Sequence, residues 1–121
     1  MSTLNVSNIT DGTTTVGTSY VVNGSAKAWV NFDGTGTIAA RDSLNVASLT
    51  DNGTGDYSVN YTSAMANDDF SMVGTSCFTS FDTWVQNAQG QTVSLADIHV
   101  TKGGSLNDAS IISVNIQGDL A

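Results

Sequence analysis

The stretch AKAWVNF, residues 26–32, alternates between two kinds of side chain and is the clearest fold signal in the chain. Successive side chains of a β-strand point to opposite faces of its sheet. One face of this stretch would carry the small and apolar side chains Ala26, Ala28, Val30 and Phe32. The opposite face would carry Lys27, Trp29 and Asn31. The alternation predicts a strand of an antiparallel sheet whose first face lies against the hydrophobic core.

Similar alternation recurs at intervals of about ten residues. The further runs lie near residues 4–9, 15–22, 38–46, 57–61, 70–73, 81–85, 93–100 and 111–116. Gly, Asn, Asp or Ser bounds each run, and residues 64–69 are the best candidate for a helical turn or loop. This spacing predicts an all-β fold, an antiparallel β-sandwich or jelly-roll-like barrel of about seven to nine short strands. We expect a single domain over residues 1–121.

The composition excludes several classes of protein. The chain has 121 residues, with eleven acids against three bases and a net charge of −8. The acids are all Asp, and the lack of Glu argues against a helical bundle. Three bases can neutralise few phosphates, so we expect no nucleic acid as a partner. No apolar run reaches the roughly 18 residues of a membrane span, so we expect no membrane as a partner. The opening residues MSTL lack the regions of a signal peptide, which predicts maturation in a cytoplasm.

Residues that could carry chemistry are sparse. Cys77 is the single cysteine, so no disulfide forms within the chain, and its neighbours predict a buried small side chain. His99 is the single histidine, and alternation places it on the same strand face as Asp97. No serine lies in a G-x-S-x-G motif, and the usual motifs of metal and nucleotide sites are absent from the sequence. We therefore expect no enzymatic activity, no cofactor and no metal site.

The segment DNGTGD, residues 51–56, predicts a hairpin turn between two strands. The pair Asn52-Gly53 tolerates the positive φ angles of a tight turn. The segment is too short for a calcium loop and lacks the terminal Glu of one. Loops expected at 33–36, 51–56 and 86–91 are candidates for contact with a partner. Within the hairpin the candidate residues are Asp51, Asn52, Gly53 and Asp56.

Trp29 is the candidate for a subunit interface. Its face also carries Lys27 and Asn31, whose charged and amide groups argue against a closed core on that side. A large ring left bare favours association, so we expect Trp29 to pack against another subunit, with Lys27 or Asn31 at its rim. A core position for the ring is the alternative. The thin apolar content and the lack of a disulfide predict a homotrimer.

Residues 27–65 read KAWVNFDGTGTIAARDSLNVASLTDNGTGDYSVNYTSAM. This segment resembles a recurring module, KAWVNFxGTGT followed by NVSSxTDNGTGDYTVN, of virion proteins of tailed bacteriophages. The module occurs at the C-terminal ends of long tail fibres and in short stand-alone proteins, and MSTLNVSNI at residues 1–9 resembles the opening strand of the latter. The resemblance covers residues 1–75, whereas residues 76–121 share only its β-rich character. No catalytic residue belongs to the module, so none is carried over.

The resemblance implies a non-enzymatic structural protein of a phage virion, made in the cytoplasm of a bacterial host. The first hypothesis is a tail fibre or tail tip component that contacts a glycan of the host surface. The alternative is a capsid decoration (cement) protein that stabilises the phage head. A glycan depolymerase is a third hypothesis, which would need paired carboxylates in a groove. Other phage structural proteins are the partners that the resemblance implies.

Overall fold

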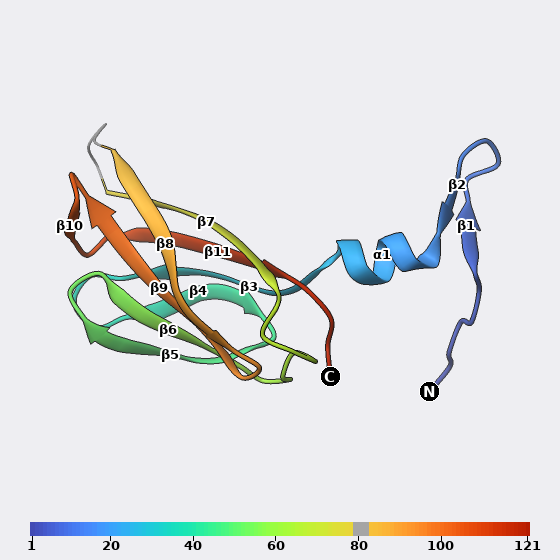
Figure 1. Cartoon of the computed structure of the whole chain (residues 1–121), viewed down its shortest axis with the longest axis horizontal. Helices are drawn as coiled ribbons and strands as arrows, with labels where there is room; N and C mark the ends of the chain where they lie inside the picture. Colours follow the sequence, from blue (N-terminus) through green and yellow to red (C-terminus); the bar gives the residue numbers. More distant parts are fainter. Residues whose placement is uncertain (79–82) are drawn as a thin grey trace.

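The structure, a computed structural model, describes residues 1–78 and 83–121. Two antiparallel sheets face each other as a sandwich (Figure 1). The first sheet has the order β5 (Val46–Gly53), β6 (Asp56–Tyr61), β9 (Leu95–Lys102) and β8 (Trp84–Thr92). The second sheet has the order β4 (Ala39–Leu44), β3 (Ala26–Asp33), β11 (Ile111–Gln117) and β7 (Ser71–Cys77). The predicted all-β, sandwich-like fold is confirmed.

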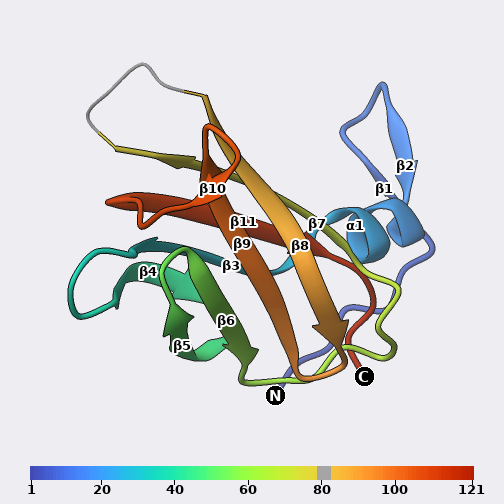
Figure 2. The ribbon, with the colours of Figure 1, turned by 60° about the vertical axis from the view of Figure 1, so that its left-hand side comes forward.

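The hydrophobic core lies between the central strands of the two sheets, which cross each other in the turned view of Figure 2. The buried apolar side chains of the central strands β3, β11, β6 and β9 are Ala28, Val30, Phe32, Tyr57, Val59, Tyr61, Ala96, Ile98, Val100, Ile112, Val114 and Ile116. The rings of Phe32 and Tyr57 meet edge to face with centroids 5.3 Å apart, so an aromatic contact joins the sheets. The pattern predicted for residues 26–32 is confirmed, because its apolar face from Ala28 onward is buried and the opposite face is half-buried.

The described residues form eleven strands, more than the seven to nine predicted. Eight of them build the two sheets of the sandwich, and the short β10 (Ser105–Leu106) pairs with the end of β9. The remaining two, β1 (Asn8–Thr10) and β2 (Thr15–Gly17), form a separate antiparallel hairpin. Strands of two or three residues escape prediction because alternation is recognisable only over about four residues or more.

The strand predicted for residues 15–22 is wrong in its second half. The chain pairs only as far as Gly17 and then forms the helix α1 (Thr18–Gly24). β1 is three residues long, so the chain beyond Gly17 has no strand to pair with. The backbone of this segment instead forms hydrogen bonds to nearby residues. One example is the Ser25 N–H, which donates to the Val21 carbonyl oxygen at 3.2 Å. The β propensity of Tyr and Val stabilises a strand only where a partner strand is present.

The run predicted over residues 38–46 is two strands in different sheets. β4 ends at Leu44, β5 begins at Val46, and Asn45 between them has a φ of 57°. Asn is one of the few residues that adopt this left-handed conformation readily. Its side chain also fixes the turn, because Oδ1 accepts a hydrogen bond from the Ser63 N–H (2.7 Å) and Nδ2 donates to the Ser63 carbonyl oxygen (3.0 Å). One residue therefore transfers the chain from the second sheet to the first.

The hairpin predicted at residues 51–56 is present, but its tip is Thr54-Gly55 rather than Asn52-Gly53. β5 continues through Gly53, and positive φ angles fall on Gly53 (141°) and Gly55 (65°). A Cβ atom at Gly55 would lie 2.5 Å from the carbonyl oxygen of Val100. Gly55 is therefore required both for its backbone angle and for the close approach of β9.

Predictions on the β7–β8 side of the sandwich need correction. Residues 86–91 are not a loop, because they lie within β8 and pair with β9. Cys77 is exposed rather than buried, since it lies opposite Ile111 at a position that faces away from the core. The run predicted at 81–85 lies in part outside the described residues, and from Trp84 onward it is β8.

Candidate functional site

The outer face of the second sheet carries a row of partly exposed side chains. The strand register places Leu44, Trp29, Asn115 and Val73 side by side across β4, β3, β11 and β7. Val73 is 65% exposed, Leu44 is 47% exposed and Trp29 is half-buried. We call the surface around this row the Trp29 face. Trp29 lies on this outer face, as its alternation predicts, and its role in a subunit interface stays a prediction.

Two shallow, mainly apolar hollows lie beside residues of the Trp29 face. The first, of about 390 Å³, is lined by Trp29, Val30, Asn31, Val73, Gly74, Thr75, Ser113, Val114 and Asn115. The second, of about 410 Å³, lies where β3 begins and is lined by Ala26, Lys27, Leu44, Asn45, Thr62, Ser63 and Leu120. Both hollows are wide open, whereas sites for small molecules bury most of the ligand. Their shape suits side chains that project from a partner surface.

A polar network closes one end of the Trp29 face. The register of β3 and β4 shifts beside Asn31, and there Arg41 donates to the Ser110 carbonyl oxygen (2.6 Å) and to Asn31 Oδ1 (3.3 Å). Asn31 Nδ2 donates in turn to Ser113 Oγ at 2.7 Å. Asn31 is therefore bonded within its own chain, and only Trp29 of the three predicted interface residues offers a large apolar surface.

Asp33 anchors the loop predicted at residues 33–36. Its Oδ1 accepts hydrogen bonds from the Thr35 hydroxyl (2.6 Å) and the Thr35 N–H (2.9 Å), and Arg41 lies 3.5 Å from its other oxygen. The pKa of Asp33 is held below its usual value. The hydrogen bond from the Thr35 hydroxyl has the largest effect, followed by the bond from the Thr35 N–H and by the charge of the Arg41 guanidinium. The loop is thus fixed around a charged carboxylate at neutral pH.

Lys27 lies at the other end of the Trp29 face, beside the start of β3. Its Nζ donates to the Ser25 carbonyl oxygen at 2.7 Å and to Ser25 Oγ at 3.3 Å. Lys27 and Arg41 are two of the three bases in the chain. Lys27 therefore places a base at this end of the Trp29 face, whereas Arg41 at the other end is paired with Asp33.

A second candidate surface lies on the outer face of the first sheet. The register places Asp56 opposite His99 and Ser58 opposite Asp97. Asn52 Nδ2 donates to Ser58 Oγ (2.8 Å) and to Asp56 Oδ1 (3.4 Å), and Ser58 Oγ donates to Asp97 Oδ1 (2.5 Å). His99 Nε2 lies 3.5 Å from Asp56 Oδ2. We call these five residues the polar cluster, and the prediction that Asp97 and His99 share a face is confirmed.

The hydrogen bonds of the polar cluster define what it can do chemically. A serine nucleophile needs its hydroxyl on a general base, usually histidine. Here the Ser58 hydroxyl donates to Asp97, while His99 faces Asp56. Among the described residues no group of three or more His, Cys, Asp or Glu side chains is placed to hold a metal ion. The cluster offers a row of donors and acceptors of the kind that bind polar ligands such as sugar hydroxyls.

The predicted contact residues of the hairpin divide between two roles. Asn52 and Asp56 belong to the polar cluster. Asp51 instead accepts a hydrogen bond from the Gly53 N–H at 3.0 Å, which stabilises the end of β5. Gly53 supplies the backbone angle of the turn and has open space around it. Of the four candidate residues, two therefore contribute side chains to the polar cluster, and their contact with a partner stays a prediction.

Residues 1–24 form an arm that leaves the end of the sandwich (Figure 1). β1, β2 and α1 belong to it, and all of its residues are exposed except Gly17 and Thr18, which are half-buried. Its hairpin turn is closed by Asp11, whose Oδ1 accepts hydrogen bonds from the N–H groups of Thr14 (2.7 Å) and Thr13 (2.9 Å). These two bonds lower the pKa of Asp11. The arm therefore has ordered backbone bonding without a buried core of its own.

Sequence reasoning identified Trp29 but not its neighbours Leu44 and Val73, nor the arm. The row depends on the register of four strands that are distant in sequence, and no local signal encodes it. The arm does have a signal, because the consecutive apolar residues 20–22 break the alternation that an amphipathic strand requires.

Comparisons with protein families, with curated proteins and with solved structures find no match to this chain. Within residues 1–78 and 83–121, no helix has the length and apolar character to cross a membrane.

Proposed function

We propose that this chain is a non-enzymatic structural protein of a tailed-bacteriophage virion, and specifically a tail fibre or tail tip component. The observation that carries the proposal is the exposed apolar surface, present both on the arm and on the Trp29 face. Monomeric soluble proteins rarely leave contiguous apolar surface bare, whereas building blocks of a particle present it to their neighbours. The resemblance of residues 27–65 to a virion module supports the same assignment. We further propose a homotrimer and other virion proteins as its partners.

Contact with a host-surface glycan is the second part of the proposal. The exposed Asn52 and the half-buried Asp56, Asp97 and His99 present amide, carboxylate and imidazole groups on the outer face of the first sheet, above the buried Ser58 hydroxyl to which two of them bond. Sugars are bound by such arrays of donors and acceptors. The Asn52→Ala variant is expected to bind host-derived surface glycan more weakly than the unchanged chain does. Asn67→Ala, in an exposed loop away from the cluster, is the matched control.

A capsid decoration protein is the second candidate, and the arm is the observation that favours it. An extended arm with exposed apolar side chains can reach across the boundary between neighbouring shell proteins. A tail fibre is a continuous shaft, so a component of it has less use for an arm that spans a boundary between neighbouring proteins.

Copy number and position in purified virions test both candidates. Quantitative mass spectrometry against the major capsid protein should find tens of copies for a tail component and hundreds for a decoration protein. Immunogold labelling should correspondingly mark the tail or the whole head. If the chain is missing from virions produced by a phage that encodes it, both candidates are rejected.

A further inference from the structure

We propose that the arm of one copy docks on the Trp29 face of a second copy of this chain. The proposal concerns the isolated protein and goes beyond the virion assignment. It can therefore be tested, and can fail, independently of that assignment.

The arm has the properties of a segment that is stable only against a partner surface. β1 and β2 have three residues each and α1 has seven, lengths at which isolated hairpins and helices are marginal in water. Leu4 is 83% exposed, Tyr20 is 77% exposed and Val22 is 59% exposed. With the other exposed apolar residues of the arm they present on the order of several hundred Å² of surface, an extent that marks interaction sites.

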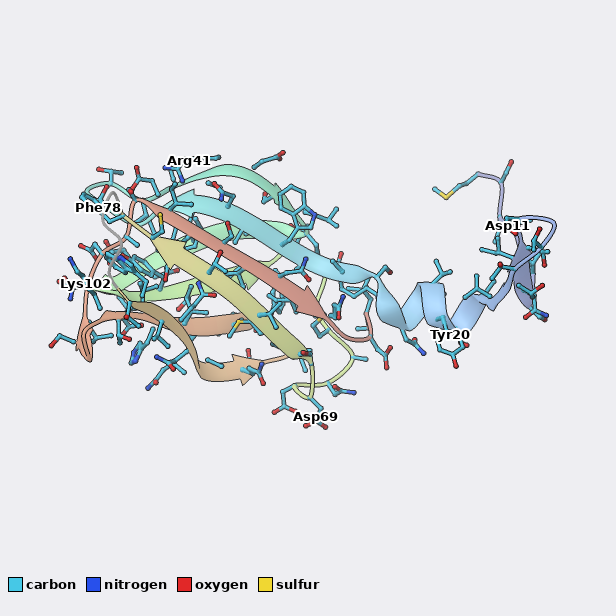
Figure 3. The ribbon with its side chains drawn as sticks, turned by 90° about the horizontal axis from the view of Figure 1, so that it is seen from above. Asp11, Tyr20, Arg41, Asp69, Phe78 and Lys102 are labelled. Carbon is cyan, nitrogen blue, oxygen red and sulfur yellow. The ribbon has the colours of Figure 1, made fainter. Side chains whose placement is uncertain are left out.

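The arm is directed away from the Trp29 face of its own copy. Ser25 alone separates α1 from β3, and Gln117 Nε2 donates to the Gly24 carbonyl oxygen at 3.1 Å, which holds the joint. In Figure 3 the arm continues beyond the end of the second sheet, and Tyr20 lies out past that end. A second copy can present its Trp29 face to the arm without any change at this joint.

Charge favours the pairing of these two surfaces over other contacts between copies. At a net charge of −8, two copies repel each other through most of their surface. The Trp29 face is balanced, because the bases Lys27 and Arg41 offset the acids Asp33 and Asp42. The arm carries one acid, Asp11, so the contact brings together two surfaces of low net charge and avoids most of the repulsion between copies.

The shape of the Trp29 face suits the side chains of the arm. The hollow lined by Trp29 and Val73, of about 390 Å³, is mainly apolar and opens outward. Tyr20 is the aromatic residue of the arm, and we assign it to the hollow between Trp29 and Val73.

Sedimentation equilibrium of the full chain and its variants tests the proposal. The unchanged chain is expected to self-associate at micromolar concentration. Tyr20→Ser on the arm and Val73→Ser on the face should each raise the dissociation constant about tenfold or more, as interface anchors do. Leu106→Ser, an equally simple truncation of an exposed apolar residue on β10, is the control and should leave association unchanged.

Cross-linking identifies the docking partner directly. The full chain is prepared with a photoreactive group in place of Tyr20, and isotope-labelled and unlabelled protein are mixed. We expect cross-links that join labelled to unlabelled copies at peptides containing Trp29, Val73 or Asn115. A chain that stays monomeric overturns the proposal. So do cross-links confined to one copy or to another surface, and so does an effect of Tyr20→Ser no larger than that of the control. Thermal unfolding of each variant should match the unchanged monomer, because neither side chain belongs to the core.

Discussion

The Tyr57 hydroxyl donates a hydrogen bond of 2.6 Å to the carboxylate of Asp108, across 51 residues of chain. The same carboxylate oxygen accepts a bond from the Gly55 N–H at 2.8 Å, and the Tyr57 hydroxyl also lies 2.8 Å from the Gly34 carbonyl oxygen. This network joins the hairpin of the first sheet to the segments that follow β3 and precede β11 in the second sheet. It therefore fixes one end of the sandwich without a disulfide.

Replacement of Tyr57 by Phe should lower the free energy of unfolding by about 1–2 kcal/mol, because it removes a buried hydrogen bond to a carboxylate. Tyr61→Phe is the matched control, since the Tyr61 hydroxyl is buried and finds no hydrogen-bond partner among the described residues. Chemical denaturation should show little change for that variant. Equal losses for the two variants would contradict the role given to the Asp108 bond.

Stability should fall at high pH because of the buried phenols. The pKa of Tyr57 lies well above its usual value near 10, mainly because the phenol is buried and also because it faces the Asp108 carboxylate. The pKa of Tyr61 is raised by burial alone. In the unfolded chain both phenols ionise near pH 10, whereas in the folded chain they stay neutral. The stabilisation is therefore complete below about pH 10 and is lost progressively above it. Denaturation curves between about pH 8 and 11 should show this decline, with a shallower slope for Tyr57→Phe.

Substitutions at the hairpin tip should destabilise the fold through the backbone. Gly53→Val places a β-branched side chain at a φ of 141° and should cost roughly 1–2 kcal/mol. Gly55→Ala should cost more than strain alone, because its Cβ would lie 2.5 Å from the Val100 carbonyl oxygen. Gly24→Ala, where a Cβ meets open space, is the control. If Gly55→Ala melts at the temperature of the unchanged chain, the close approach of β9 to this turn is disproved.

Trp29→Ala and Phe32→Ala should separate assembly from folding. Phe32 is fully buried between the sheets, and its truncation should cost about 3–5 kcal/mol of stability. Trp29 lies on the outer face, so its truncation should weaken self-association by about 2 kcal/mol or more with a smaller effect on unfolding. Thermal unfolding and sedimentation on the same samples provide the comparison. An unfolded Trp29→Ala monomer would assign the ring to the core.

The fold class and the central strands follow from local alternation in the sequence alone. Residues 26–32 and 57–61 alternate strictly, and a side chain's face within a strand depends only on its parity. The buried side of β3 and the outward position of Trp29 therefore needed no knowledge of distant residues. The same parity argument placed Asp97 and His99 together on β9, although their partners Ser58 and Asp56 come from another strand.

The pairing of the strands, and the side chains that this pairing brings together, depend on contacts between distant parts of the chain. A single left-handed residue, Asn45, divides one apparent run between two sheets. Residues 18–24 form a helix because β1 ends before them, not because their composition is helical. The row that joins Trp29 to Val73 exists because β3, β11 and β7 adopt one register over segments far apart in the chain. Local alternation specifies a face, but the neighbours on that face are set by long-range hydrogen bonding between strands.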